Sequence, residues 1–352
     1  GWGLAPIYIE KLIGVIMLLK KTIMATAALT VMSAATAALA STADHFKDRT
    51  MTIIIPYGPG GTYDKYGASF ANHIGNFIPG KPTVILQHMP GAGGTKAMAY
   101  LYNVAPKNGF FATVPLDNIV TNQLLRPKKM RFKAQNFNYL GSSNQTNIIV
   151  VARSDSGVTS IDEWKKGKSL IGATSGKSSS GYLAPALTMG LLNLKGRIVT
   201  GYKGSSRSIM SIEQGESQMA GFNWLAWSSK VPHWFKGDKP FATALVQIGV
   251  VKDPALPNVP MLTDLVAKKD KPLVSFLAAS GPIGRGLAYP PKVSSEYVAA
   301  ARTAFNKMNA DKAFAAELKK KRLRLIPSTG EQIQKIVSDS VAEASPAVVK
   351  KV

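Results

Sequence analysis

Cysteine is absent from the 352 residues of this chain. Its absence excludes disulfide bonds, thiolate metal sites, a cysteine nucleophile and a mature N-terminus that carries a thioether-linked lipid. Histidine is scarce as well, and His45, His73, His88 and His233 lack the spacing of metal ligands. We therefore expect neither a metal site nor a cofactor.

Acidic residues are few: 20 Asp and Glu stand against 43 Lys and Arg, for a formal net charge of +23. Such a surplus is found in proteins that bind polyanions or membrane surfaces, and it also steers small anions toward a site. The one dense basic run, Lys319–Arg324, lies on a predicted C-terminal helix, where a solvated face is the simpler interpretation. No basic stripe is interleaved with aromatic residues, so no nucleic-acid partner is expected. A polyanion or membrane-surface binder remains an alternative.

Long hydrophobic runs are missing beyond the N-terminus. There, Lys20-Lys21 precede an apolar, Ala-rich run from Thr22 to Ala37, and Ala38-Leu39-Ala40 has the small residues of a cleavage site. This pattern is typical of a secretory signal peptide, and the run is too short to favour a permanent membrane span. We interpret residues 1–40 as an upstream extension plus signal peptide, cleaved near Ala40, and expect an exported protein.

The rest of the sequence alternates between short apolar runs and helical patterns. Strands are predicted at residues 51–55, 83–87, 110–116, 139–140, 148–152, 169–174, 197–202, 219–222 and 241–248. A further apolar stretch covers residues 274–279, and helices are predicted over 294–309, 311–321 and 329–344. Alternation of this kind predicts an α/β fold with mostly parallel sheets.

The stretch from Ile53 to Asp64 is central to the functional prediction. Its apolar strand ends at Pro56, and glycines then allow a tight turn with exposed backbone N–H groups. Thr62 is expected to cap the following helix. A strand, a glycine turn and a helix N-terminus together make an anion site from backbone dipoles. A tight turn without a ligand is the alternative.

Similar small-residue segments recur along the chain. They are Gly58–Thr62, Gly91–Gly94, Ser175–Gly181 and Lys203–Ser206. In α/β sheets, ligands bind beyond the carboxyl ends of the strands, so these segments predict one shared cleft. The aromatic residues beside them, Tyr57, Tyr202 and Trp224, are candidates to stack on a ligand.

An exported enzyme, either a hydrolase or an enzyme acting on phosphate esters, is the competing prediction for the same loops. Residues 172–178 resemble a phosphate-binding P-loop but are one residue short of that motif. No Gly-x-Ser-x-Gly elbow is present, and His73, His88 and His233 have no evident triad partners. Gly91-x-Gly93-Gly94 is not a full dinucleotide fingerprint.

Several motifs together resemble the periplasmic solute-binding proteins of tripartite tricarboxylate transporters, the Bug family. They are residues 55–64 (strand, Pro-aromatic, x-Pro-Gly-Gly, two residues, Asp), Pro90–Gly94, Ala105–Gly109, Tyr202–Ser205 and Pro254–Pro260. The resemblance covers nearly all of the chain after the signal peptide, and the number, order and spacing of the motifs make it specific.

The resemblance implies a two-domain, type II periplasmic-binding-protein fold with the ligand between the domains, which two crossing strands join. Domain 1 would comprise residues 44–147 and 278–352, and domain 2 residues 148–277. The family binds small carboxylates, largely through backbone N–H groups, and passes them to integral-membrane transporter subunits. It implies a periplasmic monomer that catalyses nothing.

The predicted ligand-binding residues come mainly from the loops 57–64 and 173–182. They are Tyr57, Gly58, Gly60, Gly61, Thr62, Asp64, Asn118, Thr174, Ser175, Ser178, Ser179, Tyr182, Tyr202, Gly204, Ser205, Asn223 and Trp224. Asp64 is expected to support the first helical turn rather than to touch an anion. Lys177, Arg207 and Phe222-Asn223-Trp224 depart from the family pattern and are expected to line the cleft. The sequence does not indicate which carboxylate binds.

Overall fold

The computed structural model describes residues 16–24, 26, 36 and 38–343. The predicted signal peptide lies largely outside these residues, so its cleavage near Ala40 stays a prediction. Residues 38–46 are helical and lead into the first strand. Within the described part of the chain, no helix has both the length and the apolar character needed to cross a membrane.

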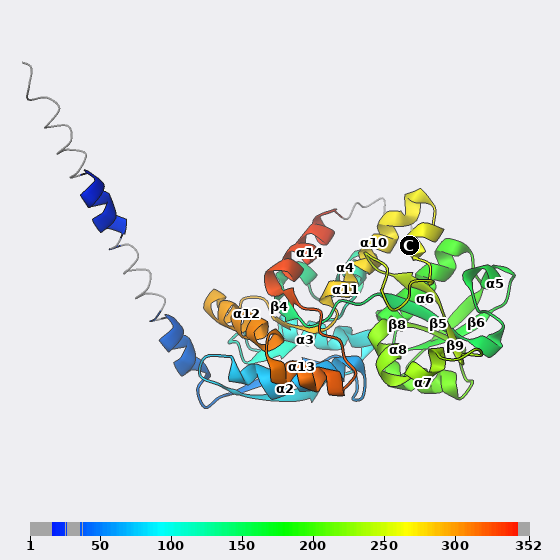
Figure 1. The fold of residues 1–352 in the computed structure, drawn as a ribbon, viewed down its shortest axis with the longest axis horizontal. Helices are drawn as coiled ribbons and strands as arrows, with labels where there is room; N and C mark the ends of the chain where they lie inside the picture. Colours follow the sequence, from blue (N-terminus) through cyan, green and yellow to red (C-terminus); the bar gives the residue numbers. More distant parts are fainter. Residues whose placement is uncertain (1–15, 25, 27–35, 37, 344–352) are drawn as a thin grey trace, which may run out of the picture.

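Two β-sheets, each flanked by helices, form two lobes (Figure 1). The six-stranded sheet has the order β11-β4-β10-β3-β1-β2, and the five-stranded sheet has the order β7-β6-β8-β5-β9. The strands of the first sheet are β1 (Thr50–Ile55), β2 (Thr83–His88), β3 (Phe111–Thr113), β4 (Asn138–Ser142), β10 (Gly286–Tyr289) and β11 (Ser328–Thr329). Those of the second are β5 (Ile148–Arg153), β6 (Leu170–Thr174), β7 (Gly196–Thr200), β8 (Met219–Asn223) and β9 (Ala242–Ile248).

The helices follow the predicted alternation. Those near the first sheet are α2 (Thr62–His73), α3 (Thr95–Asn103), α4 (Ile119–Leu125), α12 (Ser295–Asn309), α13 (Lys312–Lys320) and α14 (Gly330–Glu343). Those near the second are α5 (Ile161–Lys165), α6 (Ser180–Leu192), α7 (Ser205–Glu213), α8 (Trp224–Lys230), α9 (Leu262–Leu265) and α10 (Lys271–Ala278). The short helix α11 (Ser280–Ile283) lies on the returning segment, and its Ile283 packs in the core of the first lobe. The α/β fold class is confirmed.

Both sheets are mixed, which corrects the expectation of mostly parallel strands. In the first sheet β2, β1 and β3 are parallel, whereas β10 pairs antiparallel with β3 and β4. In the second, β7, β6 and β8 are parallel, and β5 pairs antiparallel with β8 and β9. In the first sheet the reason is the chain path, because β10 enters this sheet only after the chain has returned from the second.

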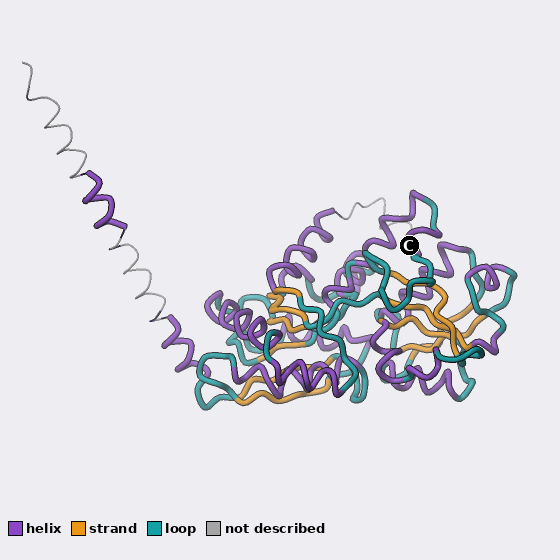
Figure 2. Tube along the Cα trace, in the orientation of Figure 1, coloured by secondary structure: helices purple, strands orange, loops and turns teal. Residues whose placement is uncertain are grey.

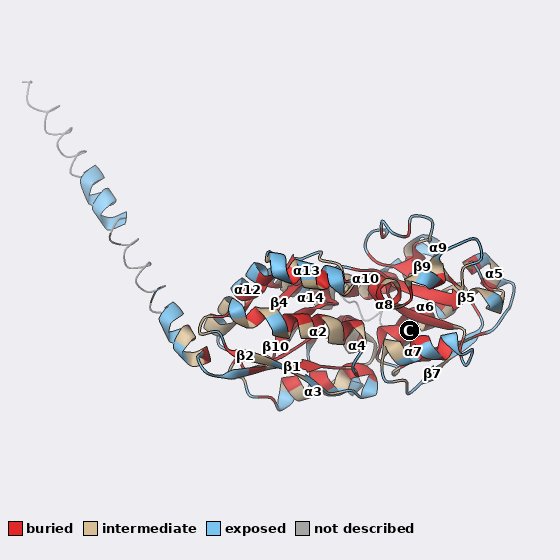
Figure 3. Ribbon diagram, turned by 60° about the horizontal axis from the view of Figure 1, so that its bottom comes forward, coloured by how far each residue is buried: buried red, intermediate tan, exposed pale blue. Residues whose placement is uncertain are grey.

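Both faces of each sheet pack against clusters of buried apolar side chains, and most of the strands are coloured as buried in Figure 3. Ile53 and Ile55 of β1 pack in the core cluster that contains residues of α2, α12 and α13, whereas Ile54 packs in the cluster with residues of α3 and α14. In β5, Val150 and Ile149 divide in the same way between two clusters. Successive strand residues point to opposite faces, so a strand covered on both sides is a continuous apolar run.

The chain crosses between the sheets twice (Figure 2). Residues 143–147 join β4 to β5 without a strand or helix, and residues 249–285 return through α9, α10 and α11. The return therefore differs from the simple crossing strand that the resemblance implied, and the apolar stretch 274–279 belongs to α10 and the turn after it. The predicted domain limits fall within these two crossings and stay a prediction.

Candidate functional site

A small cavity lies where loops from the two sheets meet. Its volume is about 40 Å³. Of the predicted residues, those that line it are Tyr57, Gly58, Gly61, Thr62, Ser175, Ser179, Gly204, Ser205 and Asn223. A neighbouring hollow of about 290 Å³ shares Tyr57, Ser175 and Gly204 and is also lined by Gly91–Gly94 and Tyr202. The structure thus brings all four small-residue segments together.

Gly60 is not among the residues that line this cavity, so its contact with a ligand stays a prediction. It is exposed, and its N–H group donates to Asp64 Oδ2 at 2.8 Å. Asp64 Oδ1 in turn lies 2.6 Å from His88 Nε2. The Asp64 carboxylate therefore orders the loop through direct contacts and does not line the cavity. The tight turn requires glycine here, because Gly60 has a φ of +90°.

Gly61 has an ordinary backbone conformation, with φ −80° and ψ 174°, and occupies the N-cap position of α2. Thr62 is consequently the first helical residue and not the predicted cap. The N–H groups of Gly61, Thr62 and Tyr63 precede the first intrahelical bond, from Lys65 N to Gly61 O. Helix N-termini leave such groups unpaired, and all three residues line the cavity.

The loop after β6 is held from behind by side chains of α4. The Ser178 carbonyl accepts from Asn118 Nδ2 at 2.6 Å and from Asn122 Nδ2 at 2.5 Å. Thr174 Oγ1 lies 2.7 Å from Ser179 Oγ. Asn118, Thr174 and Ser178 do not line the cavity and instead fix the loop that presents Ser175 and Ser179. Their contact with a ligand stays a prediction.

Three predicted aromatic residues also lie off the cavity. Tyr182 has the Arg126 guanidinium 5.8 Å from its ring centre, Tyr202 donates to Glu216 at 3.3 Å, and Trp224 packs edge-on against Phe235. The positions of these three side chains depend on the direction in which each helix or loop leaves its strand. Residue spacing in the sequence does not indicate that direction.

Tyr57 is the predicted aromatic residue that does line the cavity. Its hydroxyl donates to the Gly93 carbonyl at 3.1 Å, and its ring makes an edge contact with Tyr63. Lys177 and Arg207 are both exposed and do not line the cavity, contrary to expectation.

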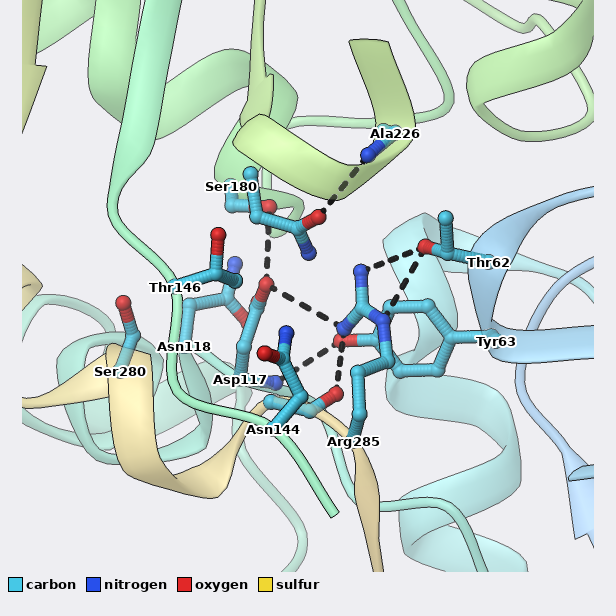
Figure 4. A network of polar contacts seen from close by, with 12 residues as sticks. Thr62, Tyr63, Asp117, Asn118, Asn144, Thr146, Ser180, Ala226, Ser280 and Arg285 are labelled. Atoms are coloured by element: carbon cyan, nitrogen blue, oxygen red, sulfur yellow. Dashed lines mark hydrogen bonds and ion pairs between the residues drawn. The ribbon is translucent and has the colours of Figure 1, made fainter. Parts of the chain in front are cut away.

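Sequence analysis missed Arg285, the buried cation of the cavity (Figure 4). Its side chain is only 3% exposed and follows the α11 turn at the start of β10. Nε and Nη2 donate to Thr62 Oγ1 at 3.1 and 2.8 Å, Nη1 donates to the Gly284 carbonyl, and the guanidinium lies 3.9 Å from the Tyr63 ring centre. The aromatic face and hydroxyl hold the cation in place.

Asp117 is the carboxylate nearest to Arg285. Its Oδ2 atom lies 3.9 Å from Arg285 Nη1 and accepts from Ser180 Oγ at 3.4 Å, while Oδ1 has no hydrogen-bond partner in the described structure. Burial raises the pKa of Asp117, although the Arg285 charge opposes this effect. The long distance leaves the Arg285 charge only partly compensated.

Lys230, at the end of α8, is a second basic residue that sequence analysis missed. Its Nζ atom donates to Ser205 Oγ and Ser206 Oγ, both at 2.8 Å. Burial, together with the Lys65 and Arg285 charges, lowers the pKa of Lys230 to about 7. No local pattern signals Arg285 or Lys230, because residues distant in sequence create both environments.

The described residues offer no assembled catalytic machinery. No group of three potential metal ligands is present among them. His73 and His88 do have acidic partners, Glu317 and Asp64, which corrects the expectation, but neither imidazole bonds a serine hydroxyl in the described part of the chain. Unpaired N–H groups, serine hydroxyls and a buried guanidinium suit the binding of an anion.

A sequence model of the tripartite tricarboxylate transporter family receptor matches residues 79–352. The chain belongs to this family. It is therefore a receptor by family and not an enzyme. This match begins after the first glycine loop. The motif at residues 55–64 is therefore separate support for the same family. A comparison with curated proteins finds no match.

Solved structures confirm the fold of this receptor. The periplasmic binding protein BugD is 16% identical, with a TM-score of 0.66 over 87% of this chain and 97% of BugD. MatC from Rhodopseudomonas palustris with bound malate is 16% identical, with a TM-score of 0.66 over 84% and 97%. A second R. palustris protein, with adipate, is 16% identical, with a TM-score of 0.66 over 86% and 96%.

Proposed function

We propose that this receptor captures a small organic carboxylate in the cavity between its two sheets. The observation that carries the proposal is the placement of Arg285 beside the free N–H groups of Gly61, Thr62 and Tyr63. A carboxylate there would accept charge-assisted hydrogen bonds and complete the partial neutralisation of the guanidinium. MatC with malate and its relative with adipate support the ligand class.

The size of the cavity implies movement. At about 40 Å³ it has room for a carboxylate group and little more, since one water needs roughly 10–15 Å³. The larger hollow next to it is the natural place for the remainder of a ligand. We infer that the lobes separate to admit the acid and close on it, so that loops of both sheets enclose one anion.

The cellular setting belongs to the same proposal. Residues 1–40 would direct export and be removed near Ala40, and the mature receptor would work in the periplasm as a monomer. Its domains would comprise residues 44–147 with 278–352, and residues 148–277. It would deliver its acid to integral-membrane subunits of a tripartite transporter. Neither a cofactor nor a nucleic acid has a part in this scheme.

Thermal-shift screening of mono-, di- and tricarboxylates on the chain beginning at Ser41 tests the function. We expect at least one acid to raise the melting temperature and to titrate at one site by calorimetry, without the continuing heat of turnover. Stabilisation by none of the aliphatic or aromatic acids would contradict the proposal. Hydrolysis of a carboxylate or phosphate ester would favour the enzyme alternative.

A further inference from the structure

Lys230 lies at the seam between the two walls of the cavity. Its Nζ atom donates to the hydroxyls of Ser205 and Ser206, which line the cavity from the second sheet. Across the seam is Gly61, where an added Cβ would lie 3.9 Å from Lys230 Nζ. The amino group therefore lies close to Gly61, at the edge of the cavity rather than in its lining.

The charges that face Lys230 are mostly of its own sign. Lys65 on α2 and Arg285 before β10 disfavour its protonated form, and Asp64 on α2 favours it. α7 contributes the two neutral serine hydroxyls. No carboxylate lies within ion-pair distance of Nζ in the described structure, so this lysine differs from a surface cation that already has its counterion.

We propose that Lys230, Ser205 and Ser206 form a second anion subsite, which makes the receptor prefer ligands with two anionic groups and take up a proton as they bind. This inference rests on the carboxylate-binding function proposed above. The first carboxylate would lie against Arg285 and the N–H groups of residues 61–63. The second would lie against the amino group, in a cavity that closes less far around a diacid than its empty volume of about 40 Å³, with the serine O–H groups turned to donate to it.

The proton uptake on binding is explained by the electrostatics of Lys230 in the empty subsite. Burial, together with the Lys65 and Arg285 charges, lowers the pKa of Lys230 in the empty receptor to about 7. An anion beside it favours the charged form and raises its pKa. Above about pH 7 the empty receptor holds Lys230 neutral and the complex holds it charged, so binding consumes a proton and weakens as the pH rises. Well below that pH Lys230 is already charged in the empty receptor, so its ammonium group takes up no proton on binding.

Calorimetry with matched acids tests the inference on the full receptor. Succinate, glutarate, malate and adipate are compared with butyrate, valerate, 2-hydroxybutyrate and hexanoate, each of which replaces one carboxylate by a methyl group. At pH 6 we expect the diacid of at least one pair to bind about tenfold more tightly or better, as a charge-assisted hydrogen bond provides. At pH 9 the preference should shrink. Titrations at pH 8 in buffers of different ionisation enthalpy should show proton uptake.

Variants of Lys230 distinguish the effect of the proposed subsite from the effect of the overall positive charge of the receptor. Lys230→Met should remove both the diacid preference and the proton uptake. Lys236→Met removes the same charge from an exposed position and should leave both unchanged. Lys230→Arg should keep the preference at pH 9 without proton uptake, because a guanidinium does not titrate in this range.

Two kinds of failure remain distinct. If neither these eight acids nor any other acid of the thermal-shift screen binds, the proposed function is contradicted and the subsite falls with it. If monoacids bind as tightly as their matched diacids, or if Lys230→Met keeps the preference, the subsite is wrong while carboxylate binding stands.

Discussion

Two basic side chains are fixed by polar contacts beside the cavity, one on the side of each sheet, in contrasting surroundings, whereas Lys203, which also lines the cavity, is exposed. Arg285 of the first wall is held by Thr62 and Tyr63 and shares its burial with Asp117. Lys230 of the second wall is held only by serine hydroxyls and titrates at about pH 7. One wall thus has a permanent charge in a prepared position, and the other has a charge that depends on pH and on the ligand.

Removal of the permanent charge should have the largest effect. Arg285→Met is expected to weaken carboxylate binding more than 100-fold, since two or more charge-assisted bonds are lost. It should also destabilise the fold by about 3 kcal/mol, because Asp117 is left buried without its cation. Calorimetry and chemical denaturation measure the two effects.

A second substitution separates binding from folding at this wall. Adding Asp117→Asn to Arg285→Met should restore much of the lost stability, because no buried charge is left unpaired, without restoring affinity. Recovery of tight binding in the double variant would show that Arg285 serves the fold alone.

The contact between the walls offers the next test. A Cβ at Gly176 would lie 2.9 Å from the Gly93 backbone nitrogen, so Gly176→Val should keep the lobes from closing. We expect about 30-fold weaker binding. Small-angle scattering should show no ligand-induced compaction, in contrast to the parent. Gly190→Val, at a position with nothing within 4 Å of the added Cβ, is the matched control and should close normally.

The first glycine loop allows a finer comparison. Gly61→Val keeps an allowed backbone conformation but places methyl groups near Ser205 and Lys230, so about tenfold weaker binding is expected, with little change in melting temperature. Asp64→Asn, which weakens the loop contacts to Gly60 and His88, should cost only about threefold. If Gly61→Val binds like the parent, this loop is only a turn.

The smallest effect on binding is expected far from both walls, at Glu317 on α13. Burial favours its neutral form, but hydrogen bonds from Lys321, His73, Ser69 and Asn72 outweigh that effect and lower the pKa of Glu317 to about 2. A depressed pKa adds stability that is present above about pH 4.5 and lost as the pH falls toward 2.

Glu317→Gln should therefore lower the free energy of unfolding at pH 7 by about 1–2 kcal/mol and flatten its decline between pH 4.5 and 2, with carboxylate affinity unchanged. Urea denaturation across this range measures the effect. Asp339→Asn breaks an exposed pair with Lys335 and should change stability by less than about 0.5 kcal/mol. A parallel pH profile for parent and Glu317→Gln would contradict the assignment.

Local patterns in the sequence predicted those parts of the site that are built locally. Runs such as Ile53–Ile55 predicted the strands, and small residues at strand ends predicted the four loops that meet at the cavity. The pattern did not predict which N–H groups are free, because the Gly60 N–H depends on the Asp64 side-chain conformation. Nor did it predict that Asn118 supports a loop from behind, since its contact with Ser178 spans 60 residues.

Local sequence patterns could not predict the buried positions of Arg285 and Lys230 either, because contacts between residues distant in sequence create them. Arg285 is buried by Tyr63 and Asp117, and Lys230 by α7 and α2, none of which is its sequence neighbour. The mixed sheets were missed because apolar runs report burial and not strand direction. Pairing partners become apparent only when the whole path of the chain is known.

That path has a consequence for how the molecule is made. The strands of the second sheet all come from the uninterrupted segment 148–248, whereas β10, which joins β3 to β4, is supplied by residues 286–289. A nascent chain that ends before residue 285 lacks both Arg285 and β10, an interior strand of the first sheet. We expect the second lobe to form first during synthesis or refolding, as a local unit of low loop-closure cost. The first lobe, and with it the anion site, would be completed only when the chain returns.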